Sequence, residues 1–410
     1  MNQQKRVVVT GLGAVTPLGL NVSEFWQGLI DGRNGIAPIT AFDAANYPIK
    51  IIGEVKGFDP EKYMPLKRVD RTSRVTHFAL AAARMAVESA KLDLALENKE
   101  RIGTVIGSGG MPALLIGMAD TFKNKGPNRI DPLIGSKISA HVVAVHVGME
   151  FGLRGPNTTV NSACASGSDA IGAALDHIRM GRADVVITGG TDATVTPITI
   201  AAMNIVGALT KNPDPDTACR PFDLNRSGFV FGEGAGMLVL ESYEHAISRG
   251  ARIMAEIAGV GWTFDAYNET APYAEMQAKV MKNALQDAGL QAEDVDYINA
   301  HGTSTRLNDS TETKAIKMVF GPRAYKIPIS SNKSMIGHLV AAAGAVEAIA
   351  TVLTLIHDII PPTIHYQTPD PECDLDYVPN KARPQRVEVA LSNSFGLGGQ
   401  NCCLIFKRAD

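Results

Sequence analysis

The sequence predicts an α/β fold in which one pattern of strands and helices occurs twice. Short runs of β-branched and apolar residues alternate with stretches of helical periodicity, which is typical of a buried sheet covered by helices. Glycines cluster at the ends of these runs, where a backbone must approach another segment closely. The repeat period of about 200 residues is far too long for a solenoid and indicates a duplicated domain.

The composition excludes several classes of protein. Of the 410 residues, 45% are hydrophobic and 20% are charged, which is typical of a globular chain with one large core or two fused cores. A net charge of −3 provides no overall field for nucleic acid. No apolar run has the length of a membrane span, and a strand pattern rather than a signal-peptide core follows Met1–Arg6. We therefore expect a cytoplasmic protein that contacts neither nucleic acid nor membrane.

The cysteines favour a reducing compartment. There are five of them, two are adjacent, and no two have Cys-x-x-Cys spacing. This pattern argues against a disulfide framework and against a zinc site, so we expect no bound metal. The cysteines are Cys164, Cys219, Cys373, Cys402 and Cys403.

The first half begins with a strand over 6–10 that runs into Gly11-Leu12-Gly13. This turn is not a dinucleotide-binding fingerprint, because Thr16 stands where the third glycine is required and Pro17 breaks the helix that would follow. The remaining strands of this half are expected over 101–109, 158–160, 184–190 and 236–240, with helices over 77–92 and 170–180.

The second half has the same order of elements. We place the boundary at Arg249-Gly250, which gives an N-terminal half over 1–249 and a C-terminal half over 250–410, and we expect a site on the pseudo-twofold axis between them. Strands are expected over 253–262, 295–303, 327–333, 387–394 and 401–406, with helices over 276–289 and 340–357.

Cys164 is the strongest candidate for a nucleophile. It stands among small residues between the strand that ends at Val160 and the helix that follows, so we expect it at a sharp turn at or near a helix N-terminus. Free N–H groups and the positive end of the helix dipole lower a thiol pKa there, and the same N–H groups can hold an oxyanion. The alternative is a buried structural cysteine.

Three further polar turns follow strands of the second half. His301 lies in Asn299–Thr305, His338 follows Asn332-Lys333-Ser334, and a glycine-rich turn follows Ser394. Sites in α/β folds lie at strand ends of this kind. A histidine at a strand end is often structural, but three such turns together with Cys164 indicate a catalytic site.

These segments resemble the elongating β-ketoacyl-acyl-carrier-protein synthases, which are condensing enzymes of the thiolase superfamily. The branch that the chain resembles is synthase II of bacterial fatty acid synthesis. The resemblance implies a five-layer αβαβα sandwich and a homodimer. The motifs that carry it are Val9–Pro17, Arg220–Asp223, Gly232–Gly236, His301–Thr303, Asn332–Ser334 and Gly337-His338.

The resemblance implies a role for each catalytic candidate. Cys164 would hold the acyl chain as a thioester, and the N–H groups of Cys164 and Leu397 would form the oxyanion hole. His301 and His338, as neutral donors, would stabilise the enolate that forms when a malonyl thioester loses CO₂. Lys333 would orient the second histidine or tune the local field, or it forms a structural ion pair with Glu347.

The resemblance also implies substrate-binding residues. Thr303 and Thr305 match positions that contact the phosphopantetheine arm, although turn capping is an equal alternative. Phe395 and Phe229 are assigned to the acyl site.

The chain departs from the synthase II pattern at several positions, of which two bear on the acyl site. Leu397 replaces a gating aromatic residue. Gly110 replaces a bulky aliphatic residue that limits the acyl tunnel, so we expect a deeper or differently bent tunnel and shorter products from Gly110→Ile.

A basic patch is expected to dock the acidic carrier protein. Its alternative is an ordinary solvated face. The candidates are Lys62, Lys67, Arg68, Arg71 and Arg74.

Three functions remain open at this point. The first is condensation in fatty acid elongation. The second is the ketosynthase subunit of a type II polyketide or polyene pathway, as a homodimer or with a partner that lacks the cysteine. The third is a non-catalytic acyl-binding partner. We expect acyl carrier protein as the partner and no bound cofactor, because the substrates are carried on phosphopantetheine. A monovalent cation near Asn299, Glu347 and Asn393 is left open.

Overall fold

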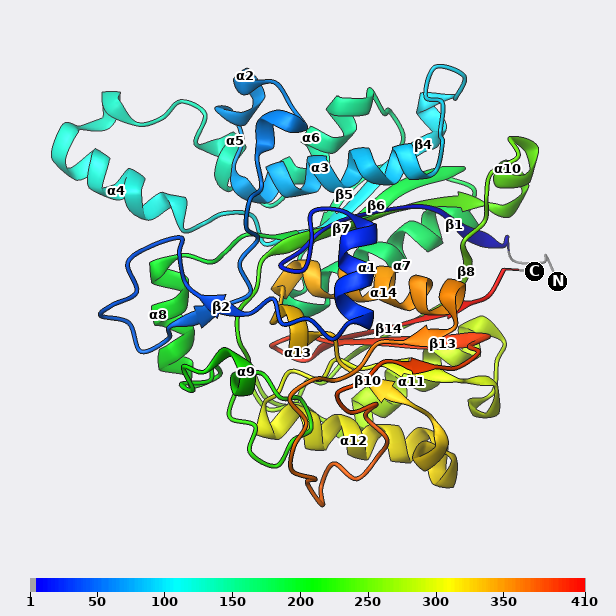
Figure 1. Ribbon diagram of the computed structural model, residues 1–410. Coiled ribbons are helices and arrows are strands. Elements are labelled where there is room, and N and C mark those ends of the chain that lie inside the picture. The colour runs from blue at the N-terminus through cyan, green and yellow to red at the C-terminus, as the bar shows by residue number, and fades with distance from the viewer. Residues whose placement is uncertain (1–4, 410) are drawn as a thin grey trace.

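The computed structural model describes residues 5–409 of the chain. It contains one ten-stranded sheet in the order β10-β9-β13-β14-β8-β1-β7-β6-β4-β5 and two small two-stranded sheets (Figure 1). The large sheet consists of two five-stranded units with the same strand order. In each unit the third strand along the chain lies at the edge and is followed by the second, fourth, fifth and first.

Four strands of the N-terminal unit run in one direction, and β7 runs in the opposite direction between β6 and β1. β5, β4 and β6 run parallel, and β7 and β1 complete the unit in antiparallel register. All residues of β1, β4, β6 and β7 are buried, because helices cover both faces. The strands are β1 (Val7–Val15), β4 (Ile102–Gly107), β5 (Asn157–Val160), β6 (Val185–Asp192) and β7 (Gly234–Ser242).

The C-terminal unit repeats this pairing. β10, β9 and β13 run parallel, and β14 and β8 are antiparallel. A short antiparallel contact, Val8 with Glu256 and Val9 with Ala255, joins the first strands of the two units. The strands are β8 (Ala255–Phe264), β9 (Tyr297–Asn299), β10 (Ile329–Ser330), β13 (Val389–Phe395) and β14 (Gln400–Lys407).

Helices separate and cover the two sheet units, so that five layers result (Figure 1). α3 (Arg74–Ser89) and α6 (Val142–Phe151) cover the outer face of the N-terminal unit. α7 (Ser166–Arg179) and α14 (Ala343–His357) lie between the units, and α11 (Ala274–Ala288) with α12 (Arg306–Phe320) covers the other outer face. The five-layer αβαβα sandwich is therefore confirmed.

The remaining elements lie around these layers. The helices are α1 (Val22–Ile30), α2 (Leu66–Val69), α4 (Leu114–Lys125), α5 (Gly135–Ile138), α8 (Pro197–Val206), α9 (Pro215–Ala218), α10 (Tyr243–Ser248) and α13 (Lys333–Ile336). The short strands are β2 (Ala37–Pro38), β3 (Ile51–Ile52), β11 (Ile359–Ile360) and β12 (Arg383–Pro384).

The helix expected over 340–357 is interrupted at its start. Val340 has a φ of +47°, so 340–342 form a 3₁₀ turn and the α-helix begins at Ala343. By length and composition, 340–357 is apolar enough to cross a membrane, so the expectation that no apolar run reaches this length is wrong. However, 83% of that window is buried inside the fold, as expected for a helix in the middle layer.

Glycines allow the middle helices to lie directly against the first sheet unit and against each other. A Cβ on Gly107 of β4 would lie 2.4 Å from the carbonyl carbon of Ser166, and one on Gly190 of β6 would lie 2.4 Å from the Ala341 oxygen. A Cβ on Gly167 of α7 would lie 2.7 Å from the Ala345 nitrogen at the start of α14. The close backbone contacts that we expected at glycines are therefore found around the turns that precede α7 and α14.

Gly167→Ala tests this packing. The added methyl meets backbone that cannot move aside, so we expect a loss of about 1–3 kcal/mol in unfolding free energy despite the better helix propensity of alanine. Gly117→Ala in the exposed helix α4 is the matched control, since a Cβ there meets nothing within 4 Å. That variant should gain up to about 1 kcal/mol. Equal denaturation midpoints for the two variants would contradict the packing account.

Candidate active site

Cys164 lies where the sequence places it, at the turn between β5 and α7. It belongs to a 3₁₀ turn, Ala163–Ala165, that runs directly into α7. Ala163 has a φ of +51°, a conformation that costs energy for a residue other than glycine. The Ser166 hydroxyl holds the turn, because it accepts from the Ser162 N–H at 2.9 Å and donates to the Ala163 carbonyl at 2.7 Å. The strained turn presents the sulfur to a cavity.

The expectation of a lowered thiol pKa is wrong. Burial raises the pKa of Cys164 above its usual value. A hydrogen bond from the Leu397 backbone and the positive charge of Lys333 act in the opposite direction, but they do not compensate for the loss of solvent. The thiol is therefore protonated at neutral pH, although its residue remains partly exposed.

His301 follows β9 and is fixed through its backbone. The carboxylate of Glu312 in α12 accepts from the N–H of His301 at 2.9 Å and from that of Gly302 at 2.8 Å. The imidazole is buried, and its Nδ1 has no hydrogen-bond partner among residues 5–409. Glu312 thus orients the residue and leaves this ring nitrogen free.

His338 is held in one tautomer. The Val340 N–H donates to Nδ1 at 3.2 Å, so the ring proton lies on Nε2. Within the described part of the chain Nε2 has no partner, and it is therefore free to donate to a substrate oxygen.

The two imidazole rings lie close together in an edge-to-face arrangement. Their ring centroids are 5.4 Å apart with an interplanar angle of 84°. Burial lowers both pKa values well below 6.5, and the charge of Lys333 lowers them further. Both histidines are therefore neutral at pH 7.

Lys333 forms the ion pair with Glu347 that the sequence left as one alternative. Both side chains are 1% exposed. Burial raises the pKa of Glu347 to about 7, although Lys333 lowers it. The ammonium also acts on both imidazoles and on the thiol, so the structural contact and an influence on the local field occur together.

The glycine-rich turn after β13 closes against the cysteine. A Cβ on Gly396 would lie 2.6 Å from the Ser162 oxygen, so only glycine allows this contact. The next residue, Leu397, hydrogen-bonds the thiol through its backbone, while its side chain is 48% exposed. The Phe395 ring lies 5.7 Å from that of His301.

One cavity of about 750 Å³ unites these segments. Phe229 also lines it and packs edge-on against His338 at 5.3 Å. Lys333 does not line the cavity. The predicted site residues in the lining are Cys164, Phe229, His301, Thr303, Thr305, His338, Phe395 and Leu397.

Gly110 does not line the cavity, and its expected role as a tunnel residue is not supported by its position. A Cβ there would point at backbone, 2.4 Å from the Ile138 oxygen and 2.8 Å from the Ala140 nitrogen. Its φ of +71° also favours glycine. Gly110→Ile would therefore distort this segment rather than shorten a tunnel, and Gly109 and Pro112 are the neighbours that reach the cavity.

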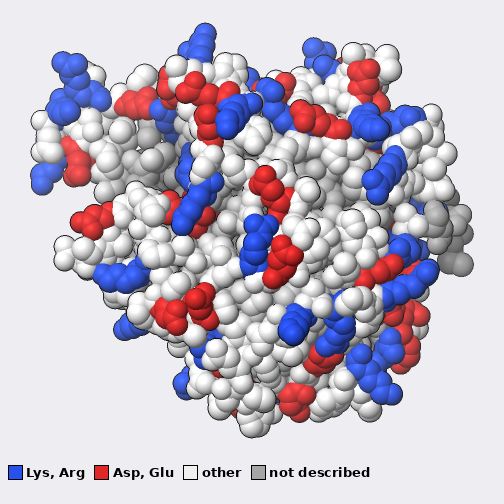
Figure 2. Space-filling model, in the orientation of Figure 1, with Lys and Arg blue, Asp and Glu red and all other residues white. Residues whose placement is uncertain are grey.

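The five basic candidates around α2 divide into two groups. Arg68 is paired with Glu150, and Arg74 is paired with Glu233 at 2.6 Å. The exposed members are Lys62, Lys67 and Arg71, which form no ion pair with the residues that the structure describes. Figure 2 shows basic and acidic side chains mixed over this face rather than a patch of one sign.

Sequence reasoning missed two buried acids at the site. Asp192 lines the cavity at the end of β6, and burial raises its pKa to about 6. Glu312 is an acid inside a helix, and no local signal marks it as the ligand of the His301 turn. The only hint for Asp192 is its place after Gly189-Gly190, at the end of a parallel strand.

Three buried oxygen atoms of the C-terminal half, one of them on Glu347, lack a hydrogen-bond partner in the described part of the chain. Asn299 Oδ1, Glu347 Oε2 and Asn393 Oδ1 are buried without a hydrogen-bond partner among residues 5–409. Carboxylate and amide oxygens are ligands for hard cations, so the donor types fit a monovalent or divalent ion. No step of the chemistry below depends on one.

The fold is thiolase-like, and Cys164, His301 and His338 line one cavity in it. A family model of the β-ketoacyl synthase N-terminal domain matches residues 4–246, and one of its C-terminal domain matches 254–367. The chain therefore belongs to the β-ketoacyl synthase family.

Curated relatives match over the whole chain. The chain is 47% identical over 410 residues to 3-oxoacyl-[acyl-carrier-protein] synthase 2 of Synechocystis sp., covering 99% of each chain. It is 45% identical over 417 residues to the enzyme of the same name from Staphylococcus aureus, covering 100% of this chain and 99% of the relative.

Solved structures agree on the fold. A type II polyketide synthase acyl-carrier protein in complex with its ketosynthase, AntDE:AntF, matches with a TM-score of 0.90 and 38% identity over 100% of both chains. The ishigamide ketosynthase/chain length factor matches with a TM-score of 0.92 and 38% identity over 100% of both chains.

The pH dependence of Cys164 alkylation tests the raised thiol pKa. Only the thiolate reacts, so the rate with iodoacetamide should rise about tenfold per pH unit up to pH 9. The other four cysteines are buried, and Cys164→Ser should abolish the fast labelling seen by intact mass. An alkylation rate that levels off below pH 8 would contradict the raised pKa of Cys164.

Proposed function

We propose that the protein catalyses the decarboxylative Claisen condensation of an acyl group with malonyl-acyl-carrier protein in fatty acid elongation. The observation that carries this proposal is a thiol that shares one cavity with two neutral imidazoles. The products are β-ketoacyl-acyl-carrier protein and CO₂. The synthase 2 names of relatives at 45–47% identity support this pathway.

The first step is transfer of the acyl group to Cys164. The sulfur attacks the thioester carbonyl of the acyl carrier, and the thiol proton leaves with the departing phosphopantetheine thiol. The N–H groups of Cys164 and Leu397 hold the negative oxygen of the tetrahedral intermediate. The hydrogen bond from Leu397 to the thiol places one of these donors beside the reacting sulfur.

The second step is condensation. The malonyl thioester carbonyl accepts hydrogen bonds from His301 and His338, so that the electrons of the breaking carbon–carboxylate bond form an enolate while CO₂ leaves. The enolate carbon attacks the acyl-cysteine, and the collapse of the intermediate releases the Cys164 thiolate, which is reprotonated. Burial keeps both rings neutral by lowering their pKa values, and the charge of Lys333 acts in the same direction.

The arm of the carrier enters past Thr303 and Thr305, which line the cavity. Their hydroxyls lie 2.9 Å apart, and that of Thr305 also caps α12 by accepting from the Asn308 N–H at 3.2 Å. Capping and arm binding are compatible, because a hydroxyl has one donor and two acceptor positions. Phe229 and Phe395 provide apolar walls for the acyl chain.

Two alternatives remain as proposals. A ketosynthase role in a type II polyketide or polyene pathway is favoured by the AntDE:AntF and ishigamide structures, at a lower identity of 38%. A non-catalytic acyl-binding partner is disfavoured by the complete Cys–His–His set.

The same proposal includes a cellular location, an oligomeric state and a partner protein. We place the enzyme in the cytoplasm as a homodimer, or as a heterodimer with a cysteine-less partner in the second pathway. Its substrates are carried on acyl carrier protein, and no bound cofactor is required. Lys62, Lys67 and Arg71 are the basic residues available for docking this acidic partner, whereas Arg68 and Arg74 are already paired.

Intact-mass analysis tests the function. After incubation with carriers bearing a series of acyl chains, we expect a mass increase equal to each accepted acyl group, which is lost in Cys164→Ser. Addition of malonyl carrier should discharge the acyl group as a β-ketoacyl product. Absence of acylation with every carrier would refute the proposal. Acceptance of only polyene or polyketide chains would favour the second pathway.

Charge reversal tests the docking residues. Lys67→Glu with Arg71→Glu should raise the KM for acyl carrier by about 3- to 10-fold and weaken its salt dependence. Lys326→Glu, at an exposed position of the C-terminal half, is the control. A KM that is unchanged and insensitive to salt would remove this docking surface.

A further inference from the structure

The segment from Thr303 to Arg306 has a strained backbone at the mouth of the cavity. Thr303, Thr305 and Arg306 line the cavity, while Ser304 points away and has a φ of +67°. A left-handed conformation is costly for serine and persists only where surrounding contacts enforce it. The positions of both threonine hydroxyls therefore depend on contacts made from behind the segment.

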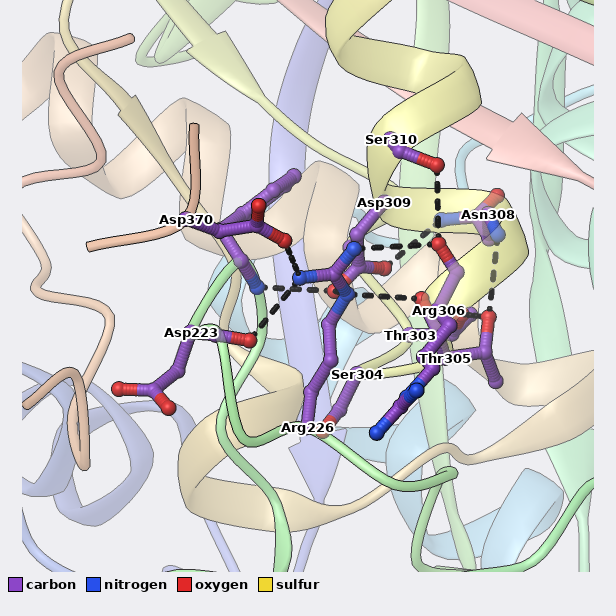
Figure 3. Close-up of polar contacts among 12 residues, drawn as sticks. Asp223, Arg226, Thr303, Ser304, Thr305, Arg306, Asn308, Asp309, Ser310 and Asp370 are labelled. Atoms are coloured by element: carbon purple, nitrogen blue, oxygen red, sulfur yellow. Dashed lines mark hydrogen bonds and ion pairs between the residues drawn. The ribbon is translucent and has the colours of Figure 1, made fainter. Parts of the chain in front are cut away.

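Arg226 provides these contacts from the buried side (Figure 3). Its Nε donates to the Thr305 carbonyl at 3.1 Å, and its Nη2 donates to the Arg306 carbonyl at 3.1 Å. Its Nη1 donates to the carbonyl of Asp223 at 2.9 Å. One planar guanidinium thus ties two carbonyls of the strained segment to the loop that carries Arg226 itself.

The guanidinium is fixed by carboxylates. Asp370 forms an ion pair with it, and an oxygen of Asp309 lies 3.6 Å from Nε. The Arg226 side chain is 2% exposed, so these charges are desolvated and hold one geometry. Burial raises the pKa of Asp309 to about 6, and Arg226 limits that rise.

Two more bonds join the same loop to Ser304. The Arg220 N–H donates to the Ser304 hydroxyl at 2.9 Å, and the Gly228 N–H donates to the Ser304 carbonyl at 3.0 Å. The loop that contains Arg226 therefore holds the segment at three consecutive residues. None of these bonds uses a threonine hydroxyl. The two hydroxyls contact each other, and that of Thr305 caps α12, but each keeps a hydrogen-bonding position for a ligand.

We infer that Arg226 is a positioning residue that holds Thr303 and Thr305 in place for the phosphopantetheine arm of the carrier. This inference rests on the proposed function, because it requires the arm to pass these threonines. Arginine is needed because its planar guanidinium donates hydrogen bonds to three carbonyls at once. A lysine ammonium has no such fixed planar geometry. Arg226 does not touch substrate, so its effect should appear in carrier binding rather than in chemistry at Cys164.

The test compares two reactions of one protein. In Arg226→Lys we expect the KM for acyl carrier to rise about tenfold, as for the loss of about one hydrogen bond. The kcat should stay within about twofold, because the catalytic residues are not contacted. Alkylation of Cys164 by iodoacetamide needs no arm and should proceed at the wild-type rate.

Asp370→Asn is the matched control. It removes the same ion pair and should lower stability, but it leaves the three carbonyl bonds in place, so the KM should not change. If Arg226→Lys does not fold, Arg226→Gln with Asp370→Asn removes both members of this ion pair together, so that Asp370 is not left unpaired. The KM of this double variant is then compared with that of Asp370→Asn alone.

Failure of the positioning role and failure of the proposed function give different results. An unchanged KM in the Arg226 variant, or a parallel fall of kcat and alkylation, would overturn the positioning role and leave a purely structural one. A wild-type protein that accepts no acyl group from any carrier would instead refute the proposed function.

Discussion

The close contact between the N-terminal ends of α7 and α14 is the constraint on which the site depends. A Cβ on Gly344 would lie 2.2 Å from the Ser168 hydroxyl oxygen, and one on Gly167 would meet the backbone of α14. Because no side chain stands between these ends, the turn that precedes each helix reaches the same cavity. One turn carries Cys164 and the other carries His338, so the two halves of the chain each contribute to one cavity, in which we propose the reaction takes place.

Burial sets the chemistry of that centre. It raises the pKa of the thiol and lowers the pKa values of both imidazoles, so that three groups which could carry charge in water are neutral in the fold. Lys333 reinforces the neutral state of the rings, and Glu347 balances its charge. In the proposed condensation, the enolate would develop its charge beside these two neutral imidazoles, and Nε2 of His338 has no partner among the described residues that would compete for its proton.

Much of this could be predicted from the sequence, because strand periodicity and glycine positions are local signals. The turn at Cys164 is confirmed, and so are the five layers, which the family resemblance rather than the periodicity implied. The sign of the thiol pKa was wrong, because a helix N-terminus is a local feature while desolvation depends on everything packed around it. Gly110 was misplaced for a similar reason: the direction of a missing side chain depends on the backbone φ. The role of Arg226 could not be predicted, since its partners lie up to 144 residues away along the chain.

The central claim is that His301 and His338 are neutral donors at physiological pH. Nuclear magnetic resonance of histidine-labelled protein tests it most directly, with the nine histidines assigned through single His→Gln variants. We expect the ring signals of both residues to stay constant from pH 8 to pH 6, with His338 in the Nε2-protonated tautomer. Titration of either ring with the ordinary midpoint near 6.5 would contradict the account.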